Sequence, residues 1–180
     1  MYEVEVKVPA ELAAVRDRLE TLEATRRGSV VQADTYYNAP HRDFAETDEA
    51  LRIRSERPAD GPEETHVTYK GPLVDEETKT REEFETGVEN DETIDAILTS
   101  LGFEATATVR KDRERFSLDG YTVTLDSVDG VGEYVEVETE VADESNLETA
   151  REGAYDVLER LELDPDDQLQ TSYLGLLLES

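Results

Sequence analysis

Polar and apolar residues alternate along many short stretches of the chain, a pattern typical of β-strands with one apolar face. In the first stretch, residues 2–8, Val4, Val6 and Val8 share one face and charged residues share the other. The predicted strands cover residues 2–8, 29–37, 50–56, 65–70, 80–89, 103–118, 121–128 and 133–141. Asp119-Gly120 between two of them is a strong hairpin signal. We therefore expect neighbouring strands to pair in antiparallel fashion.

Other stretches repeat apolar residues every three or four positions, which predicts helices. The predicted helices span residues 9–27, 91–101 and 145–162. Gly28 would end the first of them, and the apolar residues 173–178 are expected to pack back on the body. Strands outnumber helices, and the chain shows no internal repeat or long linker. We therefore predict one α+β domain over residues 1–180, an antiparallel sheet or barrel with helices outside.

The polar faces of the predicted strands gather charges of both signs. Many of the lysines and arginines lie there: Lys7, Arg52, Arg54, Lys70, Arg81, Lys111 and Arg113. Acid pairs share these faces at Glu3/Glu5 and Glu136/Glu138, and Asp126 lies on a further strand. A half-solvated sheet with a charged outer face would explain any one strand. It explains the set less well, because a surface rich in acids should carry few bases.

A barrel with its charged faces turned inward accounts for the whole set. Its lumen would be wet and highly charged. Arginine and lysine would bind phosphate oxygens there, arginine often in bidentate fashion. Carboxylates would hold a hard divalent cation such as Mg²⁺. Bases and acids in one cavity therefore predict a site for a complex of polyphosphate and metal.

Composition narrows the class of protein. The 180 residues contain 46 acids and 18 bases, a net charge of −28, which argues against nucleic-acid binding. The absence of cysteine excludes disulfides, thiolate zinc sites and cysteine nucleophiles. No apolar run approaches the ~20 residues of a membrane span, and no signal peptide is visible, so we expect a cytoplasmic protein. The acid excess and the scarcity of lysine favour adaptation to a salt-rich cytosol.

The opening Glu3-x-Glu5-x-Lys7 resembles the ExExK signature of the CYTH, or triphosphate tunnel metalloenzyme, superfamily. Further segments that resemble the family follow in order: Asp34-Thr-Tyr-Tyr37, Ala50-Leu-Arg-Ile-Arg54, Thr68-Tyr-Lys-Gly-Pro72, Lys79-Thr-Arg-Glu-Glu-Phe-Glu85, Val109-Arg-Lys-Asp-Arg113, Leu125-Asp-Ser-Val128 and Gly132-Glu-Tyr-Val-Glu-Val-Glu138. The pattern is most similar to class IV adenylate cyclases. The resemblance implies an eight-stranded antiparallel tunnel with a charged lumen, which binds ATP or another triphosphate together with Mg²⁺ or Mn²⁺.

The resemblance also implies roles for individual residues. The metals would be served by Glu3, Glu5, Glu136 and Glu138. The phosphates would be bound by Lys7, Arg52, Arg54, Lys70, Lys111 and Arg113. Arg81 and Glu83 would either contact substrate or form a salt bridge that orders the lumen, and Asp126 would assist the metals or orient a water. The expected catalytic set is therefore Glu3, Glu5, Lys7, Asp126, Glu136 and Glu138.

Three functions stay open at this point. The first is an adenylate cyclase, which converts ATP to cyclic AMP and pyrophosphate. The second is a triphosphatase, which would use the same tunnel to activate water. The third is a non-catalytic binder of polyphosphate or an organic anion, which the acid pairs disfavour. Tyr36 and Tyr37 are candidates either for holding a nucleoside or for packing, and a homodimer is left open as the assembly.

Overall fold

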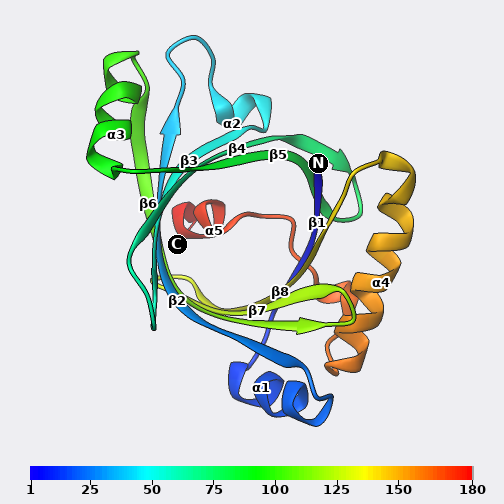
Figure 1. Cartoon of the computed structure of the whole chain (residues 1–180). Coiled ribbons are helices and arrows are strands. Elements are labelled where there is room, and N and C mark those ends of the chain that lie inside the picture. The colour runs from blue at the N-terminus through cyan, green and yellow to red at the C-terminus, as the bar shows by residue number, and fades with distance from the viewer. Residues whose placement is uncertain (180) are drawn as a thin grey trace.

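Eight antiparallel strands close into a barrel in the computed structural model, which describes residues 1–179 (Figure 1). The strands are β1 (Tyr2–Pro9), β2 (Thr25–Asn38), β3 (Ala50–Pro58), β4 (Glu64–Asp75), β5 (Lys79–Val88), β6 (Glu104–Leu118), β7 (Tyr121–Val128) and β8 (Gly132–Val141). Around the barrel they follow the order β1-β5-β4-β3-β2-β6-β7-β8, and β8 closes on β1. The predicted eight-stranded antiparallel barrel is confirmed.

Helices α1 (Leu12–Thr21), α2 (Phe44–Thr47), α3 (Asp91–Ser100) and α4 (Leu147–Arg160) flank this barrel. A further helix, α5 (Tyr173–Glu179), lines the lumen, and short 3₁₀ turns lie at Glu144–Asn146 and Pro165–Asp167. The Asn90 side chain caps α3 by accepting a hydrogen bond from the Thr93 amide at 2.9 Å. Within residues 1–179 no helix has both the length and the hydropathy to cross a membrane.

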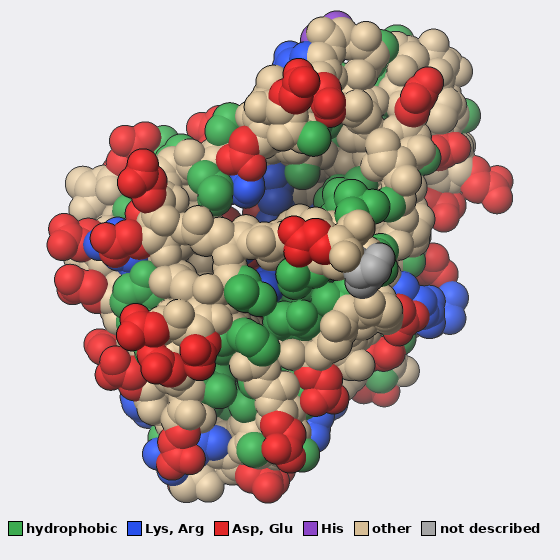
Figure 2. All heavy atoms as spheres, turned by 180° about the vertical axis from the view of Figure 1, so that it is seen from behind, with side chains coloured by type: hydrophobic (Ala, Val, Ile, Leu, Met, Phe, Trp, Pro, Cys, Tyr) green, Lys and Arg blue, Asp and Glu red, His purple; other side chains and the backbone are tan. Residues whose placement is uncertain are grey.

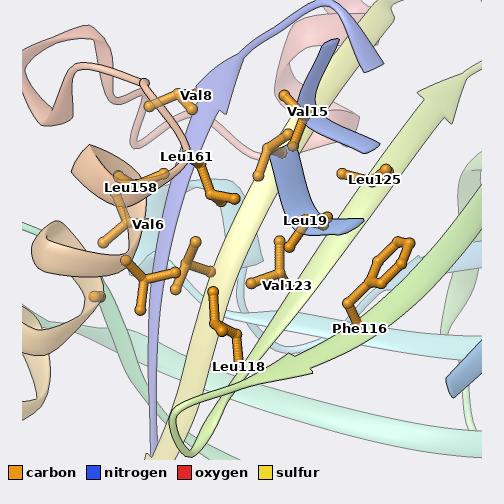
Figure 3. Packing of buried hydrophobic residues seen from close by; sticks show 14 of the residues in the cluster. Val6, Val8, Val15, Leu19, Phe116, Leu118, Val123, Leu125, Leu158 and Leu161 are labelled. Atoms are coloured by element: carbon orange, nitrogen blue, oxygen red, sulfur yellow. The ribbon is translucent and has the colours of Figure 1, made fainter. Parts of the chain in front are cut away.

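The hydrophobic core lies outside the barrel wall, between the strands and helices α1 and α4 (Figure 3). Val6 and Val8 of β1 point away from the lumen and join Leu19 of α1 and Leu158 of α4 in one buried cluster. Complete burial of such a side chain contributes about 1.5–3 kcal/mol. Because β1, β6, β7 and β8 use their apolar faces in this outer layer, their polar faces are left to the lumen.

The first predicted helix is wrong at both ends. Pro9 closes β1, and α1 begins only at Leu12. The helix ends at Thr21, because Glu23 takes a left-handed backbone conformation (φ 59°) and β2 begins at Thr25.

Gly28, predicted to stop that helix, is instead part of an irregularity in β2. The pairing of β2 with β6 shifts register between Arg26 and Gly28, and Gly28 has φ 129°. Glycine reaches this region without the steric penalty of a Cβ atom, which suits it to a bulge.

Strand β4 is longer than predicted, and the C-terminal segment returns to the barrel. The strand predicted to close at Gly71 continues as β4 to Asp75, because register shifts after Lys70 absorb the irregular residues. The apolar end packs back as predicted: Tyr173 joins Val109 and Val128 in a second buried cluster, against which Leu174, Leu176 and Leu177 pack. Seen along the barrel, α5 lies within the ring of strands (Figure 1).

Candidate active site

The lumen contains a cavity of about 570 Å³, a size typical of small-molecule sites. It is lined by nearly all of the predicted site residues: Glu3, Glu5, Lys7, Arg52, Arg54, Lys70, Arg81, Lys111, Arg113, Glu136 and Glu138. Figure 2 shows a hollow on one face, with Lys and Arg side chains at depth and hydrophobic side chains at its rim. The structure therefore brings together side chains that the sequence places more than a hundred residues apart.

Three carboxylates form a tight acidic group inside the cavity. One oxygen from each of Glu3, Glu5 and Glu138 lies within 4.8 Å of the others. The β1–β8 register places Glu5 directly opposite Glu138. Burial and the nearby charge of Glu3 raise the pKa of Glu138 to about 7. Hard oxygen donors in such a group fit a divalent cation such as Mg²⁺ or Mn²⁺, and these three residues would hold it.

Lysines lie directly against this acidic group. Lys79 Nζ is 2.8 Å from Glu5 Oε2, and Lys70 Nζ is 3.3 Å from both Glu3 and Glu83. Burial opposes the charge of Glu5, but Lys79 and Lys7 hold the pKa of its carboxyl below the usual range. Lys79 was missed as a site residue because its strand was predicted to begin one residue later. Lys79 lies two residues before Arg81, and strand alternation places residues with this spacing on the same face.

Glu136 and Asp126 lie around Arg113. Arg113 Nη2 donates to Glu136 Oε1 at 2.6 Å. Asp126 is fully buried and accepts from Arg113 Nε and Nη2, both at 2.7 Å, and from the Tyr173 hydroxyl at 2.6 Å. Among the described residues the close acidic group contains neither of them. Their roles toward metal or water stay predictions.

A second buried carboxylate, Asp34, holds the cations on the opposite wall. It accepts from Arg54 Nε at 2.6 Å and Nη2 at 2.8 Å, and from Lys111 Nζ at 3.2 Å. Burial alone would raise its pKa, but Lys111 and Arg54 hold it well below the usual range. Asp34 was not predicted as a site residue. The alternation of Gln32, Asp34 and Tyr36 on one strand face was the available signal.

Tyr173 of α5, which belongs to the apolar end expected to pack back on the body, is a lumen residue. Lys7 Nζ lies 3.8 Å from the centre of its ring and donates to the Thr171 carbonyl at 3.1 Å. Burial and the neighbouring Lys79 hold the pKa of Lys7 well below its usual value. The C-terminal segment therefore supplies part of the wall around Lys7, because the chain folds back over the barrel.

Other candidates lie toward the rim. Arg81 donates to the Gly71 carbonyl at 2.7 Å and pairs with Asp48 at 3.0 Å, an arrangement that orders the rim. Tyr36 lines the cavity and pairs in register with Arg52. The Tyr37 hydroxyl donates to Asp95 of α3 at 2.5 Å, so this side chain ties β2 to a helix. Contact of Arg81 with substrate stays a prediction.

Comparison with known proteins agrees with this geometry. The profile of the CYTH domain family matches residues 1–173. A relative from Methanocaldococcus jannaschii, named "Putative adenylate cyclase MJ0240", is 37% identical over 177 residues, which is 98% of each chain.

Solved structures show the same barrel. The PH1819 protein from Pyrococcus horikoshii superposes with a TM-score of 0.92 at 37% identity, over 98% of each chain. A more distant structure is "Putative adenylyl cyclase HpAC1" from Hippeastrum, described as having a dominant triphosphatase activity; it has a TM-score of 0.66 at 17% identity, over 99% of this chain and 95% of that one. The second likeness is one of fold alone. The family profile over nearly the whole chain, together with the relatives at 37% identity, shows that this chain belongs to the CYTH domain family.

Proposed function

We propose that this protein is a divalent-metal-dependent enzyme that binds a triphosphate in the barrel lumen and converts ATP to cyclic AMP and pyrophosphate. One observation carries the proposal: a single cavity holds the close acidic group of Glu3, Glu5 and Glu138 among lysines and arginines from β1, β3, β4, β5 and β6. Phosphates need the bases, and a cation that accompanies them needs the acids. A ligand that carries only negative or only positive charge would not need both the acids and the bases of this cavity.

The basic wall would grip the phosphate chain. Arg52, Arg54 and Lys111 come from neighbouring faces of the lumen, and each side chain is almost fully buried. Each charge-assisted hydrogen bond to a phosphate oxygen would contribute about 1.5–3 kcal/mol. These donors are already in place before the reaction, so they would stabilise charge that develops on the leaving pyrophosphate without reorganising.

The acidic group would supply the metal site. A cation bound there would neutralise phosphate oxygens and acidify a hydroxyl group beside it. Glu5 and Glu138 would orient it from adjacent strands, since they lie opposite each other in the β1–β8 pairing. The 3′-hydroxyl of ATP would then release its proton to water and attack the α-phosphorus; the new O3′–P bond would close the cyclic ester while the bond to the bridging oxygen breaks and pyrophosphate leaves.

The aromatic and aliphatic part of the cavity lining favours a nucleotide over a bare phosphate chain. This part of the lining comprises Tyr36, Phe44, Leu51 and Leu174. An aromatic base can stack or pack on such side chains while its phosphates reach the charged interior. The adenylate cyclase name of the M. jannaschii relative supports the same interpretation.

A triphosphatase is the second candidate. The charged interior recognises phosphates and does not itself require a nucleoside. Water would replace the 3′-hydroxyl as the nucleophile in the same site. The dominant triphosphatase activity described for HpAC1, a protein with this fold, supports this alternative.

Product analysis tests the proposal. The purified protein is incubated at high salt with ATP or tripolyphosphate, and with Mg²⁺ or Mn²⁺. Cyclic AMP with pyrophosphate is the expected result from ATP. Orthophosphate without cyclic AMP would move the assignment to the triphosphatase. Binding of tripolyphosphate without turnover of either substrate would contradict an enzymatic role.

A further inference from the structure

Asp34 lies behind the basic wall of the cavity. Its carboxylate is fully buried at 0% exposure, whereas Arg52, Arg54 and Lys111 in front of it line the cavity. Asp34 stands on β2, Arg54 on β3 and Lys111 on β6, the strands that pair with β2 on its two sides. One carboxylate therefore serves cations from both neighbouring strands.

The contacts fix the direction of these cations. Arg54 approaches Asp34 with its Nε–Nη2 edge, at 2.6 and 2.8 Å, in a bidentate pair. This leaves its Nη1 amino group for a ligand in the cavity. Lys111 Nζ lies 3.2 Å from Asp34 Oδ2, and Arg52 Nη1 lies 4.0 Å from the same oxygen. The two parallel hydrogen bonds to Asp34 fix the plane of the Arg54 guanidinium group, which a single hydrogen bond would leave free to rotate.

The negative charge of Asp34 weakens the attraction of the lumen for a polyanion, but it holds Arg54 and Lys111 in a fixed orientation. Without it the cations would repel one another and turn toward other acids of the lumen. The lumen would also become more positive by one charge, which attracts a polyanion more strongly. Loss of Asp34 should therefore spare ground-state attraction and damage alignment.

We propose that Asp34 is a positioning residue that holds Arg54 and Lys111 in the orientation in which they bind one phosphate group of the substrate. It acts through these two side chains and does not itself touch the substrate. The kinetic part of this inference rests on the proposed function, and a spectroscopic measurement tests it without turnover.

The kinetic test compares Asp34→Asn with wild type on the substrate that the enzyme turns over. We expect kcat to fall roughly 10- to 100-fold, the scale of small misplacements in an active site, while KM stays unchanged or falls. An unchanged kcat would overturn the proposal. So would a loss confined to KM, because that would make Asp34 a contributor to affinity.

Two further variants separate positioning from folding. Asp75→Asn removes a carboxylate that pairs with Arg151 at 3.0 Å outside the lumen, and we expect it to leave kcat unchanged. Arg54→Lys keeps the charge but cannot form the bidentate pair, so it should lower kcat as Asp34→Asn does. The double variant Asp34→Asn/Arg54→Lys should lose little more than either single variant. Additive losses, or a normal kcat in Arg54→Lys, would overturn the proposal even if Asp34→Asn failed to fold.

The spectroscopic test uses ¹⁵N resonances of arginine Nε–H groups in the ligand-free protein. The Arg54 signal, assigned with Arg54→Lys, should be protected from exchange with water in wild type and unprotected in Asp34→Asn. The Arg113 signal, whose Nε donates to Asp126 at 2.7 Å, should stay protected in both. An unprotected Arg54 signal in wild type would overturn the positioning role. A protein without turnover but with this pattern would refute only the proposed function.

Discussion

Glu5 and Lys79 form an ion pair of 2.8 Å inside the barrel, across the β1–β5 pairing that places them in register. Both side chains belong to the cavity wall. In the ligand-free protein an acid of the proposed metal site is thus neutralised by a base of the proposed phosphate site. We expect a metal–triphosphate complex to replace such internal pairs, since the cation would take the carboxylate and a phosphate would take the ammonium.

Glu5→Gln tests the metal site. The amide would keep the shape of the side chain and an oxygen toward Lys79 but lose the charge that a cation needs. We therefore expect Mn²⁺ affinity to fall at least about tenfold and activity to be lost. Titration calorimetry measures the affinity, and circular dichroism should show unchanged secondary structure. Glu82→Gln, on the exposed face of β5, is the matched control and should bind Mn²⁺ as wild type does. Wild-type affinity in Glu5→Gln would remove Glu5 from the site.

Metal binding should depend on pH through Glu138. Burial and Glu3 raise the pKa of this carboxyl to about 7, so it is protonated below that pH and charged above it. A proton and a cation compete for it, and affinity for Mn²⁺ should rise about tenfold between pH 6 and pH 8. Glu138→Gln should bind more weakly and lose this dependence. A flat profile in wild type would contradict the assignment.

Removal of the Tyr36 ring should distinguish the two candidate reactions. Tyr36 lines the cavity near Arg52, so Tyr36→Ala should lower cyclic AMP formation roughly tenfold or more and affect tripolyphosphate hydrolysis far less. Tyr37→Phe is the control: it loses the bond to Asp95 and about 0.5–1.5 kcal/mol of stability, with no change in product ratio. Equal loss of both activities in Tyr36→Ala would show that the ring only packs the wall.

The acidic surface leads to a prediction about salt. The net charge of −28 means that the acidic side chains repel one another. Salt screens this repulsion less as the Debye length grows from about 3 Å at 1 M to about 10 Å at 0.1 M salt. We expect the melting temperature to rise with KCl across this range. Scanning calorimetry checks it, and a melting temperature independent of KCl would contradict salt adaptation.

The sequence predicted the barrel wall well because strand alternation is a local signal with a period of two residues. Val6 and Lys7 were assigned to opposite faces from that period alone, and the structure places Val6 in the outer core and Lys7 in the cavity wall. Helix ends were less predictable. The left-handed residue Glu23 ends α1 before residue 27, where the helix was predicted to end.

Depth within the lumen was not predictable from the sequence. Alternation places Asp34 and Arg54 on the same side of the wall, but it does not say that the acid lies behind the base. That order depends on side-chain length and on the pairing of three strands. The apolar run 173–178 predicted that the C-terminal segment packs back on the body, but not that Tyr173 would reach Lys7, because the partner of such a long-range contact depends on the whole fold.

The strands of this barrel carry two independent sets of residues, since alternate positions serve the outer core and the lumen. Substitutions of lumen residues can therefore diversify chemistry during evolution while the apolar layer keeps its packing. Insertions are different. One extra residue between Glu3 and Val4, if no bulge such as that at Gly28 of β2 absorbed it, would turn Val6 inward and Glu5 toward the helices. We expect natural length variation in this family to concentrate in the connections, and the strands to change almost only by replacement.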